Sequence, residues 1–405
     1  MEVLRILFKP EEAELVARMP LTPTSAGRIA KMTGRRKSEV LPLLQALASR
    51  GAIIDIHDEE RGRSWYCVAP PVVGFFEFSM MRRRSDVDQK ALSVAYHEMW
   101  ETGMDALPTM LEGATTLGRT LVNEEAVAPE VMAETLTWER ATEVVADASD
   151  WSVSLCYCRH KAEHLGENCD APMDICMALN GGAAYVVQHE LGRRLDKNEA
   201  LEKLAQARES KLVHIADNVQ NNVTWLCSCC GCCCMQLKAI NEHGLVNPIR
   251  TSPFVARVDD PDKCRGCGRC ARRCPIQAIS QKGRAPVAGK RPRLLSEVDQ
   301  DVCIGCGLCV LECRHDALHM VEREQVMITP EGTLERILVQ ALERGKLQHV
   351  VFDTAGGVSM TVLNHLAGAV LRMAPVKRAL LSDRLRSRFI GFLAGAAKKG
   401  GGARV

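Results

Sequence analysis

Hydrophobic and polar positions in the N-terminal part of the chain predict two helices followed by a hairpin. Residues 22–34, TPTSAGRIAKMTG, are typical of a short helix that ends at Gly34. Residues 38–51 place valine and leucine at helical spacing, which predicts a second amphipathic helix. Residues 52–70 predict a strand, a turn at Gly62 and a second strand. The order helix, helix, hairpin therefore forms one small module.

Much of the remaining chain has a helical pattern. Amphipathic spacing predicts helices over residues 81–104, 114–127 and 129–149. Residues 196–212 begin with an Asp and Glu capping box and predict one longer helix. Residues 374–399 predict an amphipathic helix with many basic positions near the end of the sequence.

The composition changes this picture mainly through cysteine. The chain has 405 residues, of which 46% are hydrophobic, so it is long enough for two or three domains. It contains 19 cysteines, and its first residues lack the apolar stretch of a secretory signal. In a reducing compartment, so many cysteines favour metal or cluster binding over disulfides. We therefore expect a cytoplasmic, metal-binding protein.

Eight of the cysteines form two identical motifs. The pattern C-x2-C-x2-C-x3-C occurs at residues 264–274 (the first loop) and again at residues 303–313 (the second loop). In proteins with two such loops, three cysteines of one loop and the fourth cysteine of the other hold each [4Fe-4S] cluster. Two zinc sites are the alternative, but zinc ligands usually come as C-x2-C pairs that a longer loop separates. We predict one cluster on Cys264, Cys267, Cys270 and Cys313, and a second on Cys303, Cys306, Cys309 and Cys274.

These motifs resemble the two-cluster bacterial ferredoxin family over residues 259–321. The resemblance implies a small domain with pseudo-twofold symmetry, short strands, two helices and low-potential electron transfer. The second loop departs from the family because Arg314, and not proline, follows Cys313. The added positive charge should stabilise the reduced cluster and raise its potential.

Ten further cysteines lie upstream, and we expect them to bind metal. Cys156, Cys158, Cys169 and Cys176 would hold one cube, with a helix that begins at Pro172 and carries the last of them. A zinc site or buried thiols are the alternatives. Six more follow within eight residues, and adjacent side chains diverge, so some must meet the first four. The complete set is Cys156, Cys158, Cys169, Cys176, Cys227, Cys229, Cys230, Cys232, Cys233 and Cys234.

This upstream block resembles a family of anaerobic ferredoxin-domain proteins. The resemblance rests on the motifs CxCR, CDxPxxxC, LVHxxDN and CxCCxCCC in that order. Ten cysteines suit two cubes with two spare thiols, or one larger or non-cubane cluster, and we expect at least one further iron–sulfur cluster here. His214, Asn218 and Trp225 lie in this block, where packing and capping are favoured over tuning of a cluster.

The N-terminal module resembles the winged-helix family in its element order. Arg35, Arg36 and Lys37 stand where a recognition helix would begin, and Arg61 and Arg63 stand on the wing. These positions suit phosphate contacts, which makes DNA an alternative partner. Nearby acidic residues dilute the positive charge, so we favour a protein-docking module.

Basic segments suggest further partners. The segment between the two loops carries five lysines and arginines, which suits docking onto an acidic redox protein or oxidoreductase subunit. The basic amphipathic helix near residue 390 packs against protein in our preferred interpretation. Peripheral contact with an anionic membrane is the alternative.

The sequence predicts an iron–sulfur electron-transfer protein that relays low-potential electrons as a subunit or partner of an anaerobic oxidoreductase. The alternatives are a redox-sensing winged-helix transcription regulator and a self-contained reductase with substrate at the upstream cluster. The chain has no G-x-G-x-x-G fingerprint, so whether it is itself an enzyme stays open.

The predicted fold class is α+β and multidomain, with a winged-helix-like N-terminal module, a helical cysteine-rich middle, a two-cluster ferredoxin-like domain and a helical C-terminal tail. The predicted divisions are a winged-helix-like module at 1–78, a helical linker at 79–150, a cysteine-rich cluster domain at 151–258, a two-cluster ferredoxin domain at 259–325 and a helical region with a basic tail at 326–405.

Overall fold

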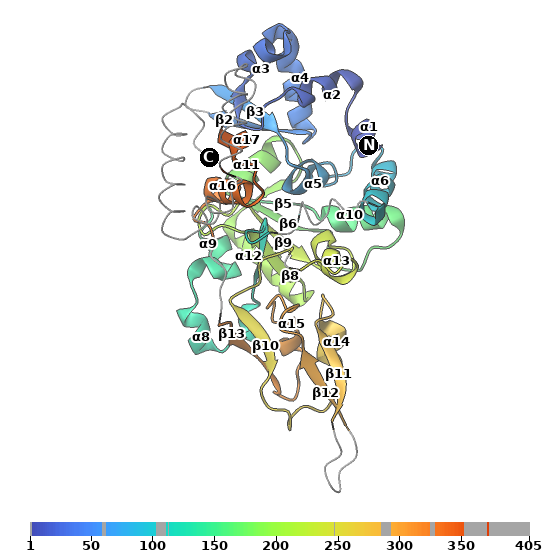
Figure 1. Ribbon diagram of the computed structural model, residues 1–405, viewed down its shortest axis with the longest axis vertical. Helices are drawn as coiled ribbons and strands as arrows, with labels where there is room; N and C mark the ends of the chain where they lie inside the picture. Colours follow the sequence, from blue (N-terminus) through green and yellow to red (C-terminus); the bar gives the residue numbers. More distant parts are fainter. Residues whose placement is uncertain are drawn as a thin grey trace. The chain divides into compact units, whose positions relative to one another are not determined.

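The computed structural model shows a mixed helix and sheet protein (Figure 1). It describes residues 2–58, 62–102, 111, 113–246, 248–284, 293–324, 329–351 and 371. The chain divides into two compact units. The first unit comprises Met1–Met99, Tyr185–Gly192 and Pro330–Val405, and the second comprises Trp100–Ala184 and Arg193–Thr329. The wing residue Arg61, the middle of the basic segment between the loops and the basic helix at 374–399 lie outside the described residues.

Helices and a three-stranded antiparallel sheet build the N-terminal part of unit 1. Ser25 caps α3 by accepting from the backbone N–H of Arg28, and Gly34 ends that helix in the left-handed conformation. The sheet order is β1-β3-β2, and the buried side chains of α3 and α4 pack on it. The elements are α1 (Glu2–Leu7), α2 (Pro10–Ala17), β1 (Thr24–Ser25), α3 (Ala26–Thr33), α4 (Lys37–Ser49), β2 (Ile53–Asp58) and β3 (Arg63–Val68).

The rest of unit 1 packs further helices and one short segment against this part. The Tyr185 hydroxyl donates to the Ile53 carbonyl on β2 at 3.0 Å, and His189 Nε2 lies 2.6 Å from Asp55 Oδ1. The carboxylate of Asp55 therefore has a partner within the unit. The remaining helices are α5 (Phe76–Phe78), α6 (Gln89–Thr102), α16 (Thr333–Glu343) and α17 (Leu347–Val351).

A six-stranded sheet forms the centre of unit 2. Its order is β4-β8-β9-β6-β5-β7, and every neighbouring pair is antiparallel. The strands are β4 (Gly118–Leu121), β5 (Trp151–Leu155), β6 (Asp174–Leu179), β7 (Arg193–Leu195), β8 (Val213–Asp217) and β9 (Trp225–Cys229). The helices around them are α8 (Pro129–Glu134), α9 (Ala141–Ala146), α10 (Tyr157–Leu165), α11 (Gly181–Gln188), α12 (Lys197–Glu209) and α13 (Met235–Asn241). From Tyr185 onward, α11 belongs to unit 1.

The two faces of this sheet bury different side chains. Helices α9 and α12 cover one face with alanine, valine and leucine. On the other face, Val213 and Ile215 of β8 lie opposite Cys229 and Cys227 of β9. Because side chains alternate along a strand, these four share one face. The cysteines of β9 therefore point away from α12.

The structure corrects the prediction of a wholly helical region before the cysteines. Residues 118–121 form strand β4, which pairs with β8. The fully buried Arg119 on this strand donates to the backbone carbonyls of Asp217 and Val219. These are pairings between distant segments, which the local pattern does not contain.

The predicted helix from Pro172 is also wrong. The chain forms strand β6 from Asp174 to Leu179, and a helix begins only at Gly181. Ile175, Met177 and Leu179 are buried in alternation, which is strand periodicity. The middle is thus a sheet with helices on it and not a helical region, whereas the α12 helix and its Asp196 capping box are confirmed.

The two cysteine loops belong to a pair of strand–helix–strand halves. The first half is β10 (Phe254–Val258), α14 (Arg269–Arg273) and β11 (Ile279–Arg284). The second half is β12 (Arg293–Val298), α15 (Leu308–Leu311) and β13 (Leu318–Glu322). Strand β10 pairs with β13 and β11 pairs with β12, both antiparallel. Within the described part of the chain, no helix is both long and apolar enough to cross a bilayer.

Candidate cluster and thiolate sites

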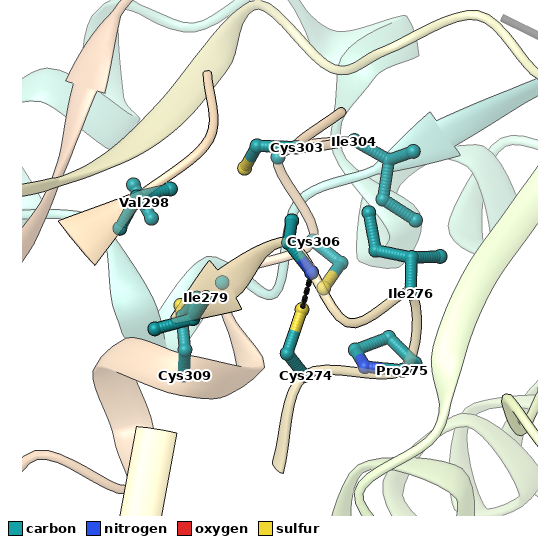
Figure 2. A pocket seen from close by; sticks show the side chains of 13 residues that line it. Cys274, Pro275, Ile276, Ile279, Val298, Cys303, Ile304, Cys306 and Cys309 are labelled. Carbon is teal, nitrogen blue, oxygen red and sulfur yellow. Dashed lines mark hydrogen bonds between the residues drawn. The ribbon is translucent and has the colours of Figure 1, made fainter. Parts of the chain in front are cut away.

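A pocket in unit 2 collects four cysteines from both loops (Figure 2). Its apolar lining includes Ile276, Ile279 and Val298. Three of its cysteines come from the second loop and the fourth is the last cysteine of the first loop. They are Cys303, Cys306, Cys309 and Cys274, the set that the spacing predicts for one cluster.

Burial raises the free energy of the thiolate form of the cysteines in this pocket. It raises the pKa of Cys306 to about 12 and also raises the pKa of Cys309 and Cys274. A buried thiol ionises readily only when a metal binds the sulfur and offsets the charge. The backbone N–H of Ala278 donates to Cys274 Sγ at 3.2 Å, which is the kind of bond that stabilises a cluster ligand. The residues of this pocket therefore fit a [4Fe-4S] cluster.

The second loop is held tightly from outside. The backbone N–H of Asn123 donates to the Cys306 carbonyl at 3.0 Å, and Ser252 Oγ donates to the Gly305 carbonyl at 2.7 Å. Gly305 has φ of +75°, and a Cβ there would overlap the backbone oxygen of Phe254. Only glycine allows this close approach in the left-handed region.

The other predicted ligand set lies on the first loop and at the end of α15. Cys264 and Cys270 are buried, Cys267 is exposed and Cys313 is half-buried. Cys270 Sγ lies 3.2 Å from the Ser296 hydroxyl on β12. The exposed edge at Cys267 gives this set the closer approach to solvent.

The ten upstream cysteines separate into two groups, which the sequence did not predict. Six thiols contact one another in a closed ring, which we call the six-thiol ring. They come from the end of β5, from α10, from β6 and β9, and from the cap of α13. Strands β9, β6 and β5 are neighbours in the sheet, so its order brings these residues together. Around the ring the thiols follow the order Cys156, Cys158, Cys234, Cys229, Cys227 and Cys176.

The other four sulfurs lie within 4.8 Å of one another, and we call them the four-thiol group. Cys169 Sγ lies 3.6 Å from Cys230 Sγ and 3.9 Å from Cys233 Sγ. Cys232 Sγ lies 3.7 Å from Cys233 Sγ. Cys169 therefore joins the turn between β9 and α13, and not Cys156, Cys158 and Cys176 as the sequence spacing suggested.

A buried arginine lies between the two groups. Arg159 on α10 is fully buried, and its guanidinium donates to the carbonyls of Pro172 at 3.1 Å and Ser228 at 3.0 Å. Burial alone would lower its pKa, but surrounding thiolates raise it above the usual value. They include Cys156 of the ring and Cys230 of the four-thiol group. The positive charge thus stabilises thiolate in both groups. The hydrogen bond from Cys233, with the charge of Arg159 as a smaller contribution, lowers the pKa of Cys230 to about 4.

The upstream cysteines and the two loops share one continuous core. Cys229 and Cys234 pack in the same cluster of buried side chains as Cys270, Cys303 and Cys309. The backbone of the four-thiol group also abuts the first loop. A Cβ on Gly231, between Cys230 and Cys232, would overlap the carbonyl oxygen of Pro275.

The three other residues singled out upstream have mainly packing roles. His214 lies opposite Ser228 on the sheet face that α12 covers, so it points away from the cysteines. Burial lowers its pKa to about 3. Asn218 donates to the Thr116 carbonyl at 3.0 Å. Trp225 packs, half-buried, against the core that contains the cysteines.

Comparison with known proteins agrees with the loop geometry. Residues 263–317 match the family model of the 4Fe-4S dicluster domain. We call this part the dicluster segment. No curated protein and no solved structure matches the chain. The dicluster segment supports the binding of iron–sulfur clusters and a role in electron transfer.

A charged contact that the sequence analysis missed connects the dicluster segment to the sheet. Glu312, next to Cys313, forms ion pairs with Lys211 and with Arg269, the latter at 2.8 Å. The Arg273 guanidinium also donates to the carbonyl of Lys211. Hydrogen bonds from Lys211 and Arg269 lower the pKa of Glu312 to about 2. No local pattern marks this pairing, because Lys211 lies 101 residues away from Glu312.

Proposed function

We propose that this protein relays low-potential electrons as a subunit or partner of an anaerobic oxidoreductase. One observation carries the proposal: the dicluster segment and the six-thiol ring share a single buried core. Electron transfer slows steeply with distance, so a relay needs its centres close together and shielded from water. Centres that lie in one buried core are both close together and shielded from water.

The proposed ligands follow the crossed pattern of the two loops. Cys264, Cys267, Cys270 and Cys313 would hold one cluster, and Cys303, Cys306, Cys309 and Cys274 the other. The pocket that contains the second set supports this assignment. Each cluster, when bound, supplies one-electron chemistry. The protein's part is to exclude water and to donate backbone hydrogen bonds such as that from Ala278.

We place the further iron–sulfur cluster in the six-thiol ring. Six thiolates exceed the needs of one cube and suit a larger or non-cubane cluster, one of the two alternatives that the sequence left open. Burial of the ring and the charge of Arg159 support this use. The ring faces the dicluster segment, which makes it the natural next centre in a relay.

The relay is tested on the full chain under anaerobic conditions. A reduced ferredoxin serves as donor, and rapid-freeze EPR follows each centre. Replacing Cys303 by Ala should slow reduction of the upstream centre at least tenfold while its signal remains in equilibrium samples. Replacing the buried Cys67, which lies in unit 1, should leave the rate unchanged. An upstream centre that is reduced at the wild-type rate in the Cys303 variant would contradict the proposed route.

A redox-sensing regulator is the second candidate. The element order of the N-terminal part, with α2, α3 and α4 before the hairpin of β2 and β3, supports a winged-helix module. Its basic residues are partly engaged, since Arg35 pairs with Glu14 and Arg36 pairs with Glu39. This pairing favours docking to a protein over binding to phosphates. A tight, salt-sensitive complex with promoter DNA, lost when Arg35, Arg36 and Lys37 become Ala, would favour the regulator.

A further inference from the structure

We propose that the four-thiol group binds a single tetrahedral Zn²⁺ ion and not an iron–sulfur cube. The group consists of Cys169, Cys230, Cys232 and Cys233. The relay does not depend on this inference, because the ion would hold the structure together and carry no electrons.

The sulfur spacing is that of a mononuclear site. A tetrahedral zinc ion with Zn–S bonds of about 2.3 Å holds its thiolates about 3.8 Å apart. The sulfur–sulfur distances of 3.6, 3.7 and 3.9 Å in this group match that edge. In a cube each thiolate binds a different iron, which spreads the sulfurs to roughly 6 Å apart.

The backbone around the group resists such spreading. Cys230, Cys232 and Cys233 lie in one tight turn, which the hydrogen bond from the Cys234 N–H to the Cys230 carbonyl closes at 3.2 Å. Gly231, at the centre of this turn, lies directly against the backbone of Pro275. The turn has no room to open toward the dicluster segment.

The chemistry of the donor set also fits zinc. Four thiolates complete a closed structural site and leave no open position for a substrate. Binding would release the protons of those thiols that are not yet ionised. Arg159 offsets part of the remaining negative charge, because its field reaches Cys230. Cys232 is exposed, so an ion can enter from solvent.

The site has a structural consequence. An ion on both Cys169 and the turn would tie the segment before β6 to the segment after β9. It would also fix the turn that supports Pro275, the residue next to the cluster ligand Cys274. Bound zinc would thereby brace the turn that abuts Pro275.

Two adjacent cysteines provide a matched test. Cys229 belongs to the six-thiol ring and Cys230 to the four-thiol group. The full chain is produced anaerobically with zinc and iron both supplied, and zinc, iron and sulfide are measured in each variant. We expect Cys230→Ala to lower zinc by about tenfold or more while iron and sulfide stay near wild type. Cys229→Ala should retain the zinc and lose upstream iron and sulfide.

A measurement on the wild-type protein keeps the test decisive if a variant fails to fold. Zinc-edge X-ray absorption should show a single shell of four sulfurs at about 2.3 Å. Wild-type protein that holds iron and sulfide but no stoichiometric zinc would overturn the proposal. So would loss of sulfide-bound iron, with zinc unchanged, in Cys230→Ala. Neither result would bear on the proposed electron relay, which is tested separately by the rate at which the upstream centre is reduced.

Discussion

The dicluster segment and the upstream cysteine block gather their thiols in different ways. In the dicluster segment, three ligands of each predicted cluster lie within one short loop, and only the fourth comes from the other loop. In the upstream block, the six-thiol ring draws on β6, β9 and the starts of α10 and α13. The first arrangement depends on local turns, whereas the second depends on the order and register of a sheet.

This difference explains why neighbouring cysteines upstream serve different groups. Strand β9 ends at Cys229, and the turn begins at Cys230. The strand directs Cys229 to the face of Val213, whereas the turn directs Cys230 toward Cys169. A change of backbone conformation between two residues thus places Cys229 and Cys230 in two different groups of thiols.

The largest effect is expected from a ligand that crosses from one loop to the cluster of the other. Cys274 belongs to the first loop, but it lines the pocket of Cys303, Cys306 and Cys309. Cys274→Ala should therefore remove the cluster of the second loop, a loss of about four irons. Anaerobic iron and sulfide analysis with EPR of the reduced protein measures this, and Cys67→Ala is the control.

The outcome that contradicts crossed ligation is specific. If Cys274→Ala removes the cluster on Cys264, Cys267 and Cys270 and leaves the other intact, each loop serves its own cluster. The dicluster segment would then be wholly local in its ligation.

The difference between ligands gathered by local turns and ligands gathered by the sheet also explains how much of the site could be predicted from the sequence. The spacing of the two loops led to the dicluster segment, because the motif itself carries the ligand geometry. The division of the ten upstream cysteines could not be obtained this way. It requires knowing that β6 lies between β9 and β5, which is a property of the whole sheet. The helical pattern assigned to residues 114–127 failed for a similar reason, since β4 forms only by pairing with β8.

Some upstream features were nevertheless visible in the sequence. The motif CxCR places an arginine next to two cysteines, and Arg159 is indeed the buried charge beside them. His214 was harder to place. Its sequence context favoured packing over tuning of a cluster, and strand alternation turns it to the face opposite the cysteines.

Adding one methyl group where the upstream cysteine block abuts the dicluster segment should lower the free energy of unfolding. Gly231→Ala introduces a Cβ that overlaps the carbonyl oxygen of Pro275, and neither backbone can move freely. Overpacking of this kind costs about 1–3 kcal/mol of unfolding free energy. Anaerobic urea denaturation measures the loss. Gly283→Ala on β11 is the matched control, because a Cβ there meets nothing within 4 Å. Equal stability of the two variants would mean that the regions do not abut at Gly231.

The buried arginine should tune the upstream centre and leave the dicluster segment unaffected. Arg159→Gln removes a positive charge beside Cys156, so the reduced upstream cluster loses stabilisation. We expect its potential to become more negative by roughly 50 mV, which corresponds to about 1 kcal/mol for one electron. Anaerobic EPR-monitored titration provides the measurement, and Arg159→Lys should restore much of the shift. A positive shift, or an equal shift in the dicluster centres, would refute this role.

The smallest effect is expected from the partly exposed ion pairs of Glu312, which connect the dicluster segment to the upstream block. The folded-state pKa of Glu312 is about 2, below the ordinary glutamate value of about 4.3. The carboxylate therefore contributes its full stability above about pH 4.3 and loses it as the pH falls toward about 2. Because the pairs with Lys211 and Arg269 are partly exposed, Glu312→Gln should cost at most about 1 kcal/mol at neutral pH.

Between pH 6 and pH 8 the difference in unfolding free energy between wild type and variant should be constant, and added salt should reduce it. Urea denaturation at two salt concentrations tests this, with the exposed Glu322→Gln as control. A difference that grows steadily from pH 6 to pH 8, or that salt leaves unchanged, would show that Glu312 stabilises the junction by packing and not by its charge.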